Sequence, residues 1–297
     1  MTDRLLRSGL IIVDKPAGMT SHDVISRLRR IFGTRRIGHA GTLDPMATGV
    51  LVVGIERGTR FLAHLVTETK TYRATIRLGA STTTDDAEGD ITSRTDITDV
   101  TDTLIDAAIA QLTGDIMQKP AAVSAIKIDG KRAHERVRDG ETVDIPARPV
   151  TVHRFDVLDR RSVDGYIDLD VDVFCSSGTY IRSLARDLGN ALGVGGHLTA
   201  LRRTTVGPFD LTHARTLEEL EDNPQLSLTL DQALAVSFPI LRVSGEEGHK
   251  LAMGQWLEPR GLKGIHAAVT PDGQAVALVK EKGKRLATVF VARPSTL

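Results

Sequence analysis

The stretch IGHAGTLDPMATG, residues 37–49, leads directly into the apolar run VLVVGI, residues 50–55. The first part contains few large side chains, so its backbone can approach a ligand closely. Asp44 is its one carboxylate, and Pro45 restricts the preceding residue to an extended backbone, which helps to fix the direction of that side chain. An aspartate before proline is also a common turn residue. The pattern predicts a loop before a buried strand, with Asp44 as either a turn residue or a reactive group.

Periodic apolar patterns on both sides of this loop predict further strands and helices. Residues 70–78 alternate cleanly, which is typical of a half-buried strand. Ser21 is the expected N-cap of a helix that Gly33 ends. More strands are expected at residues 10–13, 167–175 and 197–206, and more helices at residues 99–112, after residues 176–179 as far as Gly193, and in two segments before Pro239. Strands and helices without strict alternation favour the α+β class.

The composition describes an ordinary globular protein. The chain has 297 residues, of which 41% are hydrophobic and 26% charged, with a net charge of zero. This length is typical of about two domains and can bury a large core without disulfides. The single cysteine, Cys175, excludes an intramolecular disulfide and fits a reducing cytoplasm. No apolar run approaches the ~20 residues that span a bilayer, so we expect a cytoplasmic protein without a membrane partner.

After Pro239 the sequence predicts only short strands and turns. Residues 271–273, Pro-Asp-Gly, separate two apolar runs at 265–269 and 275–279, which is a hairpin signal. We therefore expect a large domain at residues 1–239 and a small β-rich domain at residues 240–297.

Charges are segregated along the chain. Residues 15–43 contain six Lys or Arg and one acidic residue, whereas residues 85–106 contain eight acidic residues and one arginine. Residues 119–154 are basic and irregular, and residues 240–297 carry a charge of +4. A local basic face can attract a polyanion although the total charge is zero. Solvated faces are the alternative interpretation of the same runs.

Signatures of several other enzyme classes are absent from the sequence. It contains no Walker or dinucleotide-binding glycine pattern, no His-Glu-x-x-His pair and no Gly-x-Ser-x-Gly elbow. The histidines lack metal-ligand spacing, so no metal site is expected. The acidic segment 85–90 fails the EF-hand pattern because Ile91 occupies the glycine position, and a solvated loop is expected there. On the strand at 167–175, Asp168, Asp170 and Asp172 are expected to point outward.

Several ordered motifs resemble those of the bacterial tRNA pseudouridine(55) synthase family, commonly called TruB. Residues 37–49 resemble its catalytic motif, and residues 9–21 resemble its N-terminal motif. Further matches follow in the expected order at residues 70–72, 118–120, 124–127 and 175–182. The Gly-Thr-Leu-Asp-Pro run at residues 41–45 is the most specific of these matches.

The resemblance implies a role for individual residues. Asp44 would be the catalytic aspartate, Arg182 would pair with it, and Tyr72 would stack on the target base. Leu201 would pack under the site, and His39 and Tyr180 would lie beside the substrate. The expected RNA contacts are Lys15, Arg27, Arg30, Lys127, Lys131, Arg132, Arg136 and Arg202, with Lys15 also a candidate for loop support.

The resemblance also implies a fold and a reaction. The fold would be that of pseudouridine synthases, with a mixed, mainly antiparallel central sheet flanked by helices. A PUA-like RNA-binding domain would follow at residues 240–297, and the basic segment at about 119–154 would be an RNA-gripping insertion. The enzyme would isomerise uridine 55 in the TΨC arm of tRNA without a cofactor or metal. It would act as a monomer without an obligate protein partner.

A carboxylate suits this reaction. An aspartate of ordinary pKa, about 3.9, is ionised at neutral pH. The target base must leave its stack, which costs a few kcal/mol, before Asp44 can reach it. Asp44 can attack the sugar C1′, attack the base C6 or remove a sugar proton, and the residues leave this choice open.

Two other functions share some of these features. A non-catalytic RNA-binding protein would use the basic runs but would not need Asp44. A glycoside hydrolase or nucleosidase would pair Asp44 with Asp85 or Asp86, and would need the two carboxylates about 5–9.5 Å apart.

Overall fold

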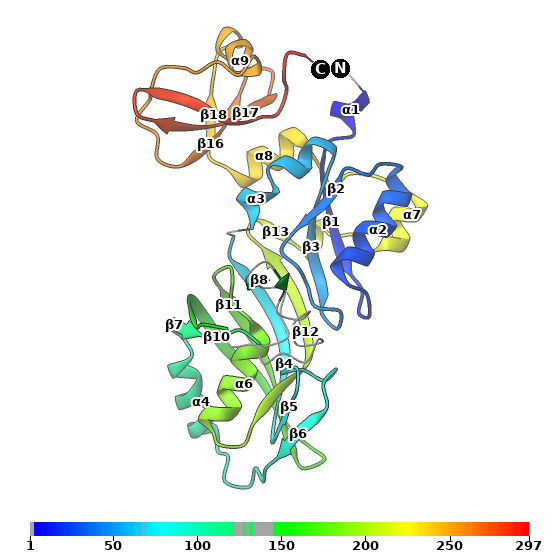
Figure 1. Cartoon of the computed structure of the whole chain (residues 1–297), viewed down its shortest axis with the longest axis vertical. Coiled ribbons are helices and arrows are strands. Elements are labelled where there is room, and N and C mark those ends of the chain that lie inside the picture. The colour runs from blue at the N-terminus through cyan, green and yellow to red at the C-terminus, as the bar shows by residue number, and fades with distance from the viewer. Residues whose placement is uncertain (1–2, 67, 122–126, 129–130, 133–144, 297) are drawn as a thin grey trace. The chain divides into compact units, whose positions relative to one another are not determined.

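The computed structural model describes residues 3–66, 68–121, 127–128, 131–132 and 145–296. The chain forms two compact units (Figure 1). Unit 1 combines the N-terminal segment 1–67 with residues 205–297, and unit 2 contains residues 68–204.

Unit 1 contains most of the helices. Its elements are α1 (Asp3–Leu6), β1 (Gly9–Lys15), α2 (Ser21–Phe32), β2 (Ile37–Ala40), β3 (Thr48–Ile55), η1 (Glu56–Arg60), α3 (Leu62–Leu65), β13 (Phe209–Asp210), η2 (Leu211–His213), α7 (Leu217–Asp222), β14 (Leu228–Thr229), α8 (Leu230–Ser237), β15 (Ile240–Arg242), α9 (Gly245–Ala252), β16 (Ile265–Val269), β17 (Ala275–Lys282) and β18 (Arg285–Val291).

Unit 2 is built mainly from strands. Its elements are β4 (Lys70–Leu78), β5 (Ala80–Thr82), β6 (Ile91–Arg94), α4 (Asp102–Gln111), β7 (Gly114–Gln118), β8 (Lys127–Ile128), β9 (Lys131–Arg132), β10 (Arg148–Val163), β11 (Tyr166–Cys175) and α6 (Ile181–Ala191). The last strand, β12 (Gly196–Val206), continues into unit 1.

The strands of unit 1 form a buried layer. β1 pairs antiparallel with β3 and β14, and β2 pairs antiparallel with β3. Almost every residue of β1 and β3 is buried, because side chains on both faces of these strands enter apolar clusters. The apolar face of α2 covers one of these clusters through Val24, Ile25 and Leu28. The short helix α7 lies beside α2 (Figure 1).

Helix α2 ends at Gly33 as predicted, but it begins differently from the expectation. Its N-cap is Thr20, whose hydroxyl accepts a bond of 3.1 Å from the Asp23 backbone N–H. The Asp23 carboxylate accepts in return from the Thr20 N–H at 2.9 Å, which completes a capping box. The prediction of Ser21 as the cap is therefore wrong by one residue.

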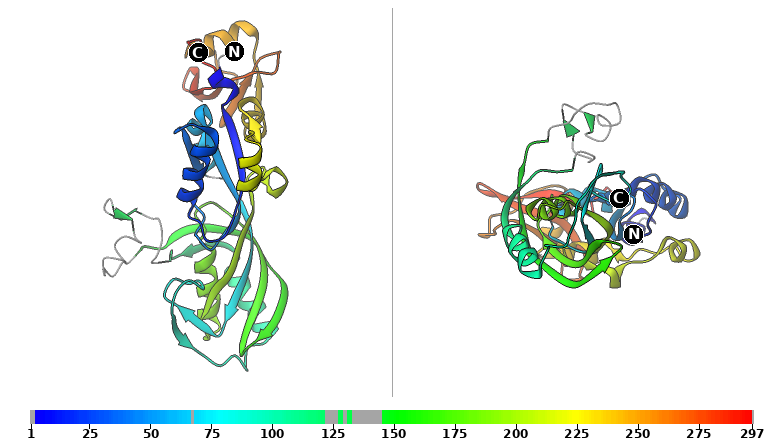
Figure 2. Two further views of the ribbon diagram at one scale, coloured as in Figure 1. Left: turned by 90° about the vertical axis from the view of Figure 1, so that its right-hand side faces the viewer. Right: turned by 90° about the horizontal axis from the view of Figure 1, so that it is seen from below.

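In unit 2 the strand order is β12-β4-β11-β10-β7, and the pairings of β4, β11, β10 and β7 are antiparallel. An isolated parallel bridge joins Asp86 to Leu198, and another in unit 1 joins Val13 to Arg215. The sheet is thus mixed and mainly antiparallel, as expected. The strands curl around α6, which lies on their concave side (Figure 2).

Most predicted elements of unit 2 are confirmed, with three corrections. Strand β4 has the predicted bounds, and its alternate residues are buried. Asp168 is not outward and solvated: it is 5% exposed, and both its oxygens accept bonds of 2.8 Å from Arg77 on the neighbouring strand. Residues 148–154 lie on strand β10, with a shift of pairing register between Val152 and Arg154, rather than in an irregular segment. Helix α4 covers Asp102–Gln111 rather than the whole of the predicted range 99–112.

A separate four-stranded sheet, ordered β15-β16-β17-β18, follows Pro239. The predicted hairpin is confirmed as β16 and β17. Side chains from this sheet, including Phe290, share one apolar cluster with Leu10 and Phe61 of the N-terminal segment. The rings of Phe61 and Phe290 are 6.0 Å apart. A separate domain at residues 240–297 remains a prediction.

Candidate active site

The Asp44 loop connects β2 to β3 within unit 1. Gly41 and Gly49 adopt φ values of 80° and 99°, which L side chains rarely adopt, so these two positions favour glycine. The Asp44 carbonyl accepts a bond of 3.1 Å from the Ala47 N–H, which closes a turn. Leu43 and Ala47 are buried on either side, whereas Asp44 is partly exposed. The loop is therefore anchored by its apolar residues, and Asp44 between them is partly exposed.

Lys15 anchors the Asp44 loop through a hydrogen bond to the Pro45 carbonyl. Its side chain is fully buried, and Nζ donates to the carbonyls of Pro16, Met19 and Pro45 at 2.7, 2.6 and 3.2 Å. The Gly18 N–H donates to the same Pro45 carbonyl at 2.8 Å. A buried ammonium that bonds three carbonyls holds two loops together. This placement favours the support role of Lys15 over an RNA contact.

Ser21 is a second anchor of the Asp44 loop, and this role was not predicted. Its hydroxyl donates to the Leu43 carbonyl at 3.1 Å and accepts from the Leu43 N–H at 2.9 Å. The residue before Asp44 is thereby tied to the first residue of α2. The sequence contained no local signal for this contact, because a serine at the start of a helix is read as a cap.

His39 lies on β2, opposite Val53 of β3, with its side chain partly buried. Its expected position beside the substrate remains a prediction.

Unit 2 carries the other substrate-binding candidates. Tyr72 on β4 and Leu201 on β12 are each 7% exposed. Tyr180 precedes α6, and its backbone N–H and carbonyl are both bonded by the Gln118 side chain, at 2.8 and 3.1 Å. Gln118 therefore aligns the start of α6, which carries Arg182.

Arg182 is buried at the first turn of α6. Its Nε lies 3.6 Å from Oδ2 of Asp86, and its guanidinium donates to the Thr84 carbonyl at 3.0 Å. The side chains of Arg182 and Asp86 are 5% and 4% exposed. The other oxygen of Asp86 accepts from the Thr84 hydroxyl at 2.5 Å and from the Glu88 N–H at 3.0 Å. Asp86 thus restricts the orientation of Arg182.

These contacts correct the expectation of a solvated acidic loop at residues 85–90. Besides Asp86, Asp85 is largely enclosed and lies 3.2 Å from Arg186. Burial raises the pKa of Asp85, whereas Arg186 and Arg182 act in the opposite direction. Arg186 also donates to the Lys119 carbonyl at 2.7 Å, so it joins this loop to the start of the basic segment.

A buried pair of cations in unit 2 was not expected. Lys70 and Arg203 are 7% and 1% exposed. Burial, and then the charge of Arg203, lower the pKa of Lys70 to about 8. Lys70 Nζ donates to the Glu68 carbonyl at 2.8 Å. The alternation of β4 was the available signal, because it places Lys70 on the same buried face as Tyr72.

The expected RNA contacts fall into different environments. Arg27 is already engaged, with bonds of 2.7 and 2.8 Å to Glu221 and a contact of 3.1 Å to Glu218 on α7. Arg30 is exposed, and Arg202 is partly buried on β12. For Lys127, Lys131 and Arg132 the structure gives only the backbone of β8 and β9. Arg136 lies outside the described residues.

Within the ranges that the structure describes, no group of three or more His, Cys, Asp or Glu side chains could hold a metal ion. No described helix is both long and apolar enough to cross a membrane.

Comparison with solved structures gives the class of protein. The chain matches a chain of a Cbf5-Nop10-Gar1 complex with a TM-score of 0.74 and 27% identity, over 99% of this chain and 87% of the other. It matches a chain of an H/ACA RNP bound to a substrate RNA containing 2′-deoxyuridine with a TM-score of 0.72 and 26% identity, over 98% and 86%. The fold is that of a pseudouridine synthase, with helices around a mixed sheet and a small C-terminal β-sheet.

Sequence comparison narrows this class to one family. Residues 29–181 match the model of the TruB family pseudouridylate synthase N-terminal domain. Residues 182–235 match the tRNA pseudouridylate synthase B C-terminal domain, and residues 238–293 match the tRNA pseudouridine synthase II C-terminal model. The tRNA pseudouridine synthase B of Corynebacterium efficiens is 72% identical over the whole of both chains. That of Nocardia farcinica is 60% identical over 97% of this chain and 94% of its own. The chain belongs to the TruB family and is a pseudouridine synthase, an isomerase.

Proposed function

We propose that this enzyme converts uridine 55 in the TΨC arm of tRNA to pseudouridine. The observation that carries the proposal is the Asp44 loop, which the buried Lys15 and Ser21 anchor through bonds to Pro45 and Leu43, on either side of the partly exposed Asp44. Further support comes from relatives of 60–73% identity, which are named tRNA pseudouridine synthase B.

In the proposed reaction the target uridine leaves its stack and enters the site. The C1′–N1 bond breaks, the uracil turns, and C1′ bonds to C5. The proton of C5 is then lost and N1 regains a proton, so the product has the mass of the substrate. Asp44 acts as the nucleophile towards C1′ or C6, or as the base that removes a sugar proton.

Arg182 and Tyr72 have supporting roles in this proposal. The resemblance to the family implies that Arg182 pairs with Asp44, where a guanidinium would favour and orient the charged carboxylate. Tyr72 stacks on the flipped base, a contact worth about 1–3 kcal/mol in proteins that bind single strands. Leu201 packs under the base, and His39 and Tyr180 complete its surroundings.

The rest of the substrate is held through phosphates and RNA shape, because only 4% of the residues are aromatic. The basic segment at about 119–154 and a PUA-like domain at residues 240–297 provide this grip. The enzyme acts as a cytoplasmic monomer and needs neither cofactor nor metal.

The test is tritium release from an unmodified tRNA transcript labelled at uridine C5, followed by mapping of pseudouridine in the product. We expect release from the wild type, modification at position 55, and no release from Asp44→Asn. Asp90→Asn is the control, because it makes the same substitution at an exposed aspartate outside the Asp44 loop. Binding without release would favour the RNA-binding alternative, and free uracil among the products would favour the nucleosidase.

A further inference from the structure

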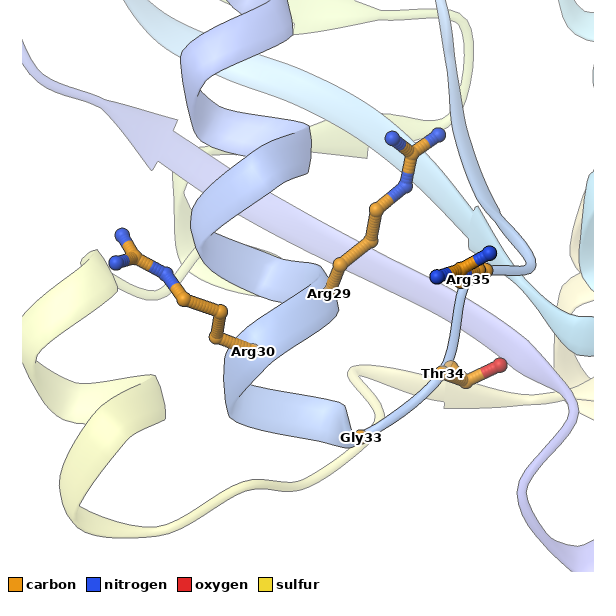
Figure 3. Close-up of a pocket in the computed structure, with 5 residues that line it drawn as sticks. All are labelled: Arg29, Arg30, Gly33, Thr34 and Arg35. Carbon is orange, nitrogen blue, oxygen red and sulfur yellow. The ribbon is translucent and has the colours of Figure 1, made fainter.

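We propose that a pocket at the C-terminal end of α2 binds a backbone phosphate of the RNA substrate, away from the reacting nucleotide. The pocket has a volume of about 600 Å³ and is lined by Arg29, Arg30, Gly33, Thr34 and Arg35 (Figure 3). The proposal rests on the proposed function, because it takes RNA as the substrate.

The lining of this pocket is strongly positive. No carboxylate lines it. Within the described part of the chain, Arg29, Arg30 and Arg35 form no ion pair with a carboxylate. One carboxylate lies beside the lining, because the Thr34 hydroxyl donates to Glu56 at 2.5 Å, and the charge of Arg30 acts on Glu221. Arg29 and Arg35 extend on the same side of the helix end, whereas Arg30 projects from the other side (Figure 3). Each of these guanidiniums is a planar group of donors that suits a phosphate.

Arg29 supplies the second observation. Its Nε is buried and has no hydrogen-bond acceptor among the described residues. Its only bond there is a long one, 3.5 Å from Nη2 to the Ile37 carbonyl. A buried donor without an acceptor costs about 1–3 kcal/mol, so a protein seldom keeps one without a reason. An anion in the pocket would offer the Arg29 guanidinium an acceptor besides the distant Ile37 carbonyl.

The simpler interpretation is that these arginines only stabilise the end of the helix. The carboxyl end of a helix carries a charge of about −0.5, which basic side chains complement. However, Arg7 already donates to the carbonyl of Phe32, the last residue of α2, at 2.5 Å. The lining arginines together carry far more charge than the helix end requires. They therefore leave an excess of positive charge at the pocket.

One helix connects this pocket to the Asp44 loop. Ser21, at the first turn of α2, bonds Leu43 next to Asp44, whereas Arg29 and Arg30 lie in its last turn. The 12 residues of α2 span about 18 Å at about 1.5 Å per residue. A phosphate in the pocket would therefore belong to a nucleotide well outside the flipped uridine. Helix α2 would thus set the distance between the bound phosphate and the uridine at Asp44.

The adjacent Arg36 offers a matched control. It lies in the same loop and is also exposed, but it does not line the pocket, and its guanidinium lies 3.6 Å from the Glu56 carboxylate. Arg35→Ala and Arg36→Ala remove the same formal charge from adjacent positions of one loop. A difference between them reports the pocket rather than the general positive field.

The experiment measures tRNA binding by both variants and the wild type over a series of KCl concentrations. We expect Arg35→Ala to bind tRNA about 3- to 10-fold more weakly at low salt, with the slope of log K against log salt reduced by about 0.9. Arg36→Ala should change both much less. Titration with inorganic pyrophosphate is the parallel arm, and circular dichroism checks the fold.

Equal losses in the two variants would overturn the proposal, because they would report only the general field. A loss of pyrophosphate binding by Arg35→Ala with unchanged tRNA binding would also overturn it and would indicate a site for a small phosphate compound. Failure of the proposed function is distinguishable, since the wild type would then neither bind nor modify tRNA.

Discussion

Arg182 and Asp86 form a buried ion pair, with Nε and Oδ2 3.6 Å apart and both side chains at most 5% exposed. Such a pair is costly to desolvate and is retained only with further hydrogen bonds to its members. Here Thr84 forms a hydrogen bond with each member of the pair. Its carbonyl accepts from Arg182, and its hydroxyl donates to Asp86. One short segment thus fixes both charges, and Asp86 is a positioning residue for Arg182.

Asp86→Asn should therefore lower turnover more than tRNA affinity. The amide keeps the shape of the side chain but removes the negative charge of Asp86 beside the buried guanidinium. Removal of one member of a buried pair costs about 3–5 kcal/mol of stability. Single-turnover rates at saturating tRNA, tRNA binding and thermal unfolding measure the three effects.

Asp90→Asn is the matched control, because Asp90 belongs to the same acidic segment but is exposed. It should leave all three measurements unchanged. If Asp86→Asn lost tRNA affinity with a normal single-turnover rate, the positioning role would be wrong.

Lys15→Met should destabilise the Asp44 loop. Methionine fills a similar volume but leaves the carbonyls of Pro16, Met19 and Pro45 without their shared donor. The Pro45 carbonyl keeps its bond from the Gly18 N–H, whereas the Pro16 and Met19 carbonyls lose the ammonium. A buried unsatisfied group costs about 1–3 kcal/mol, and less where water enters. We expect a clearly lower melting temperature and slower turnover, measured by calorimetry and by tritium release.

Lys263→Met serves for comparison, since Lys263 is exposed in unit 1. A Lys15→Met protein as stable as this control, with full activity, would show that the ammonium does not hold the loop.

These two sites show what the sequence could and could not predict. The periodicity of residues 70–78 gave the bounds of β4, because one face of that strand is buried along its whole length. The contact between Asp86 and Arg182 joins residues far apart in the chain, and an acidic run carries no local sign that one of its members will be buried. The choice between Thr20 and Ser21 as the cap also escaped prediction, since both are good caps and the tertiary contact of Ser21 with Leu43 decides between them.

Arg57 should determine how firmly the C-terminal sheet packs on the N-terminal segment. It is 5% exposed, and its guanidinium donates to the carbonyls of Ala292, at 2.7 Å, and Val291. It also lies over the ring of Phe290, with Cζ 5.7 Å from the ring centre. Arg57→Ala removes both bonds and the ring contact, so we expect faster hydrogen exchange in β18 and easier proteolysis near residue 240.

The control for this change is Arg60→Ala, because Arg60 belongs to the same short helix but is exposed. Equal exchange rates in β18 for the two variants would contradict the role of Arg57.

Lys70 makes the stability of the protein depend on pH in the alkaline range. Burial lowers its pKa from 10.5 to about 8, so between these values the folded chain has lost a proton that the unfolded chain still binds. Stability rises with pH wherever the unfolded state binds more protons, so the Lys70 contribution is destabilising below pH 8 and diminishes towards pH 10.5. The Lys70 contribution can be removed by substitution.

The variant Lys70→Met lacks the buried ammonium. Urea unfolding at several pH values should show that Lys70→Met is more stable than the wild type at pH 7, and this difference should shrink as the pH rises. Lys280→Met, at an exposed position, should show no such trend. A difference between Lys70→Met and the wild type that stays constant from pH 7 to pH 10.5 would mean that Lys70 titrates normally, and that its burial carries no electrostatic cost.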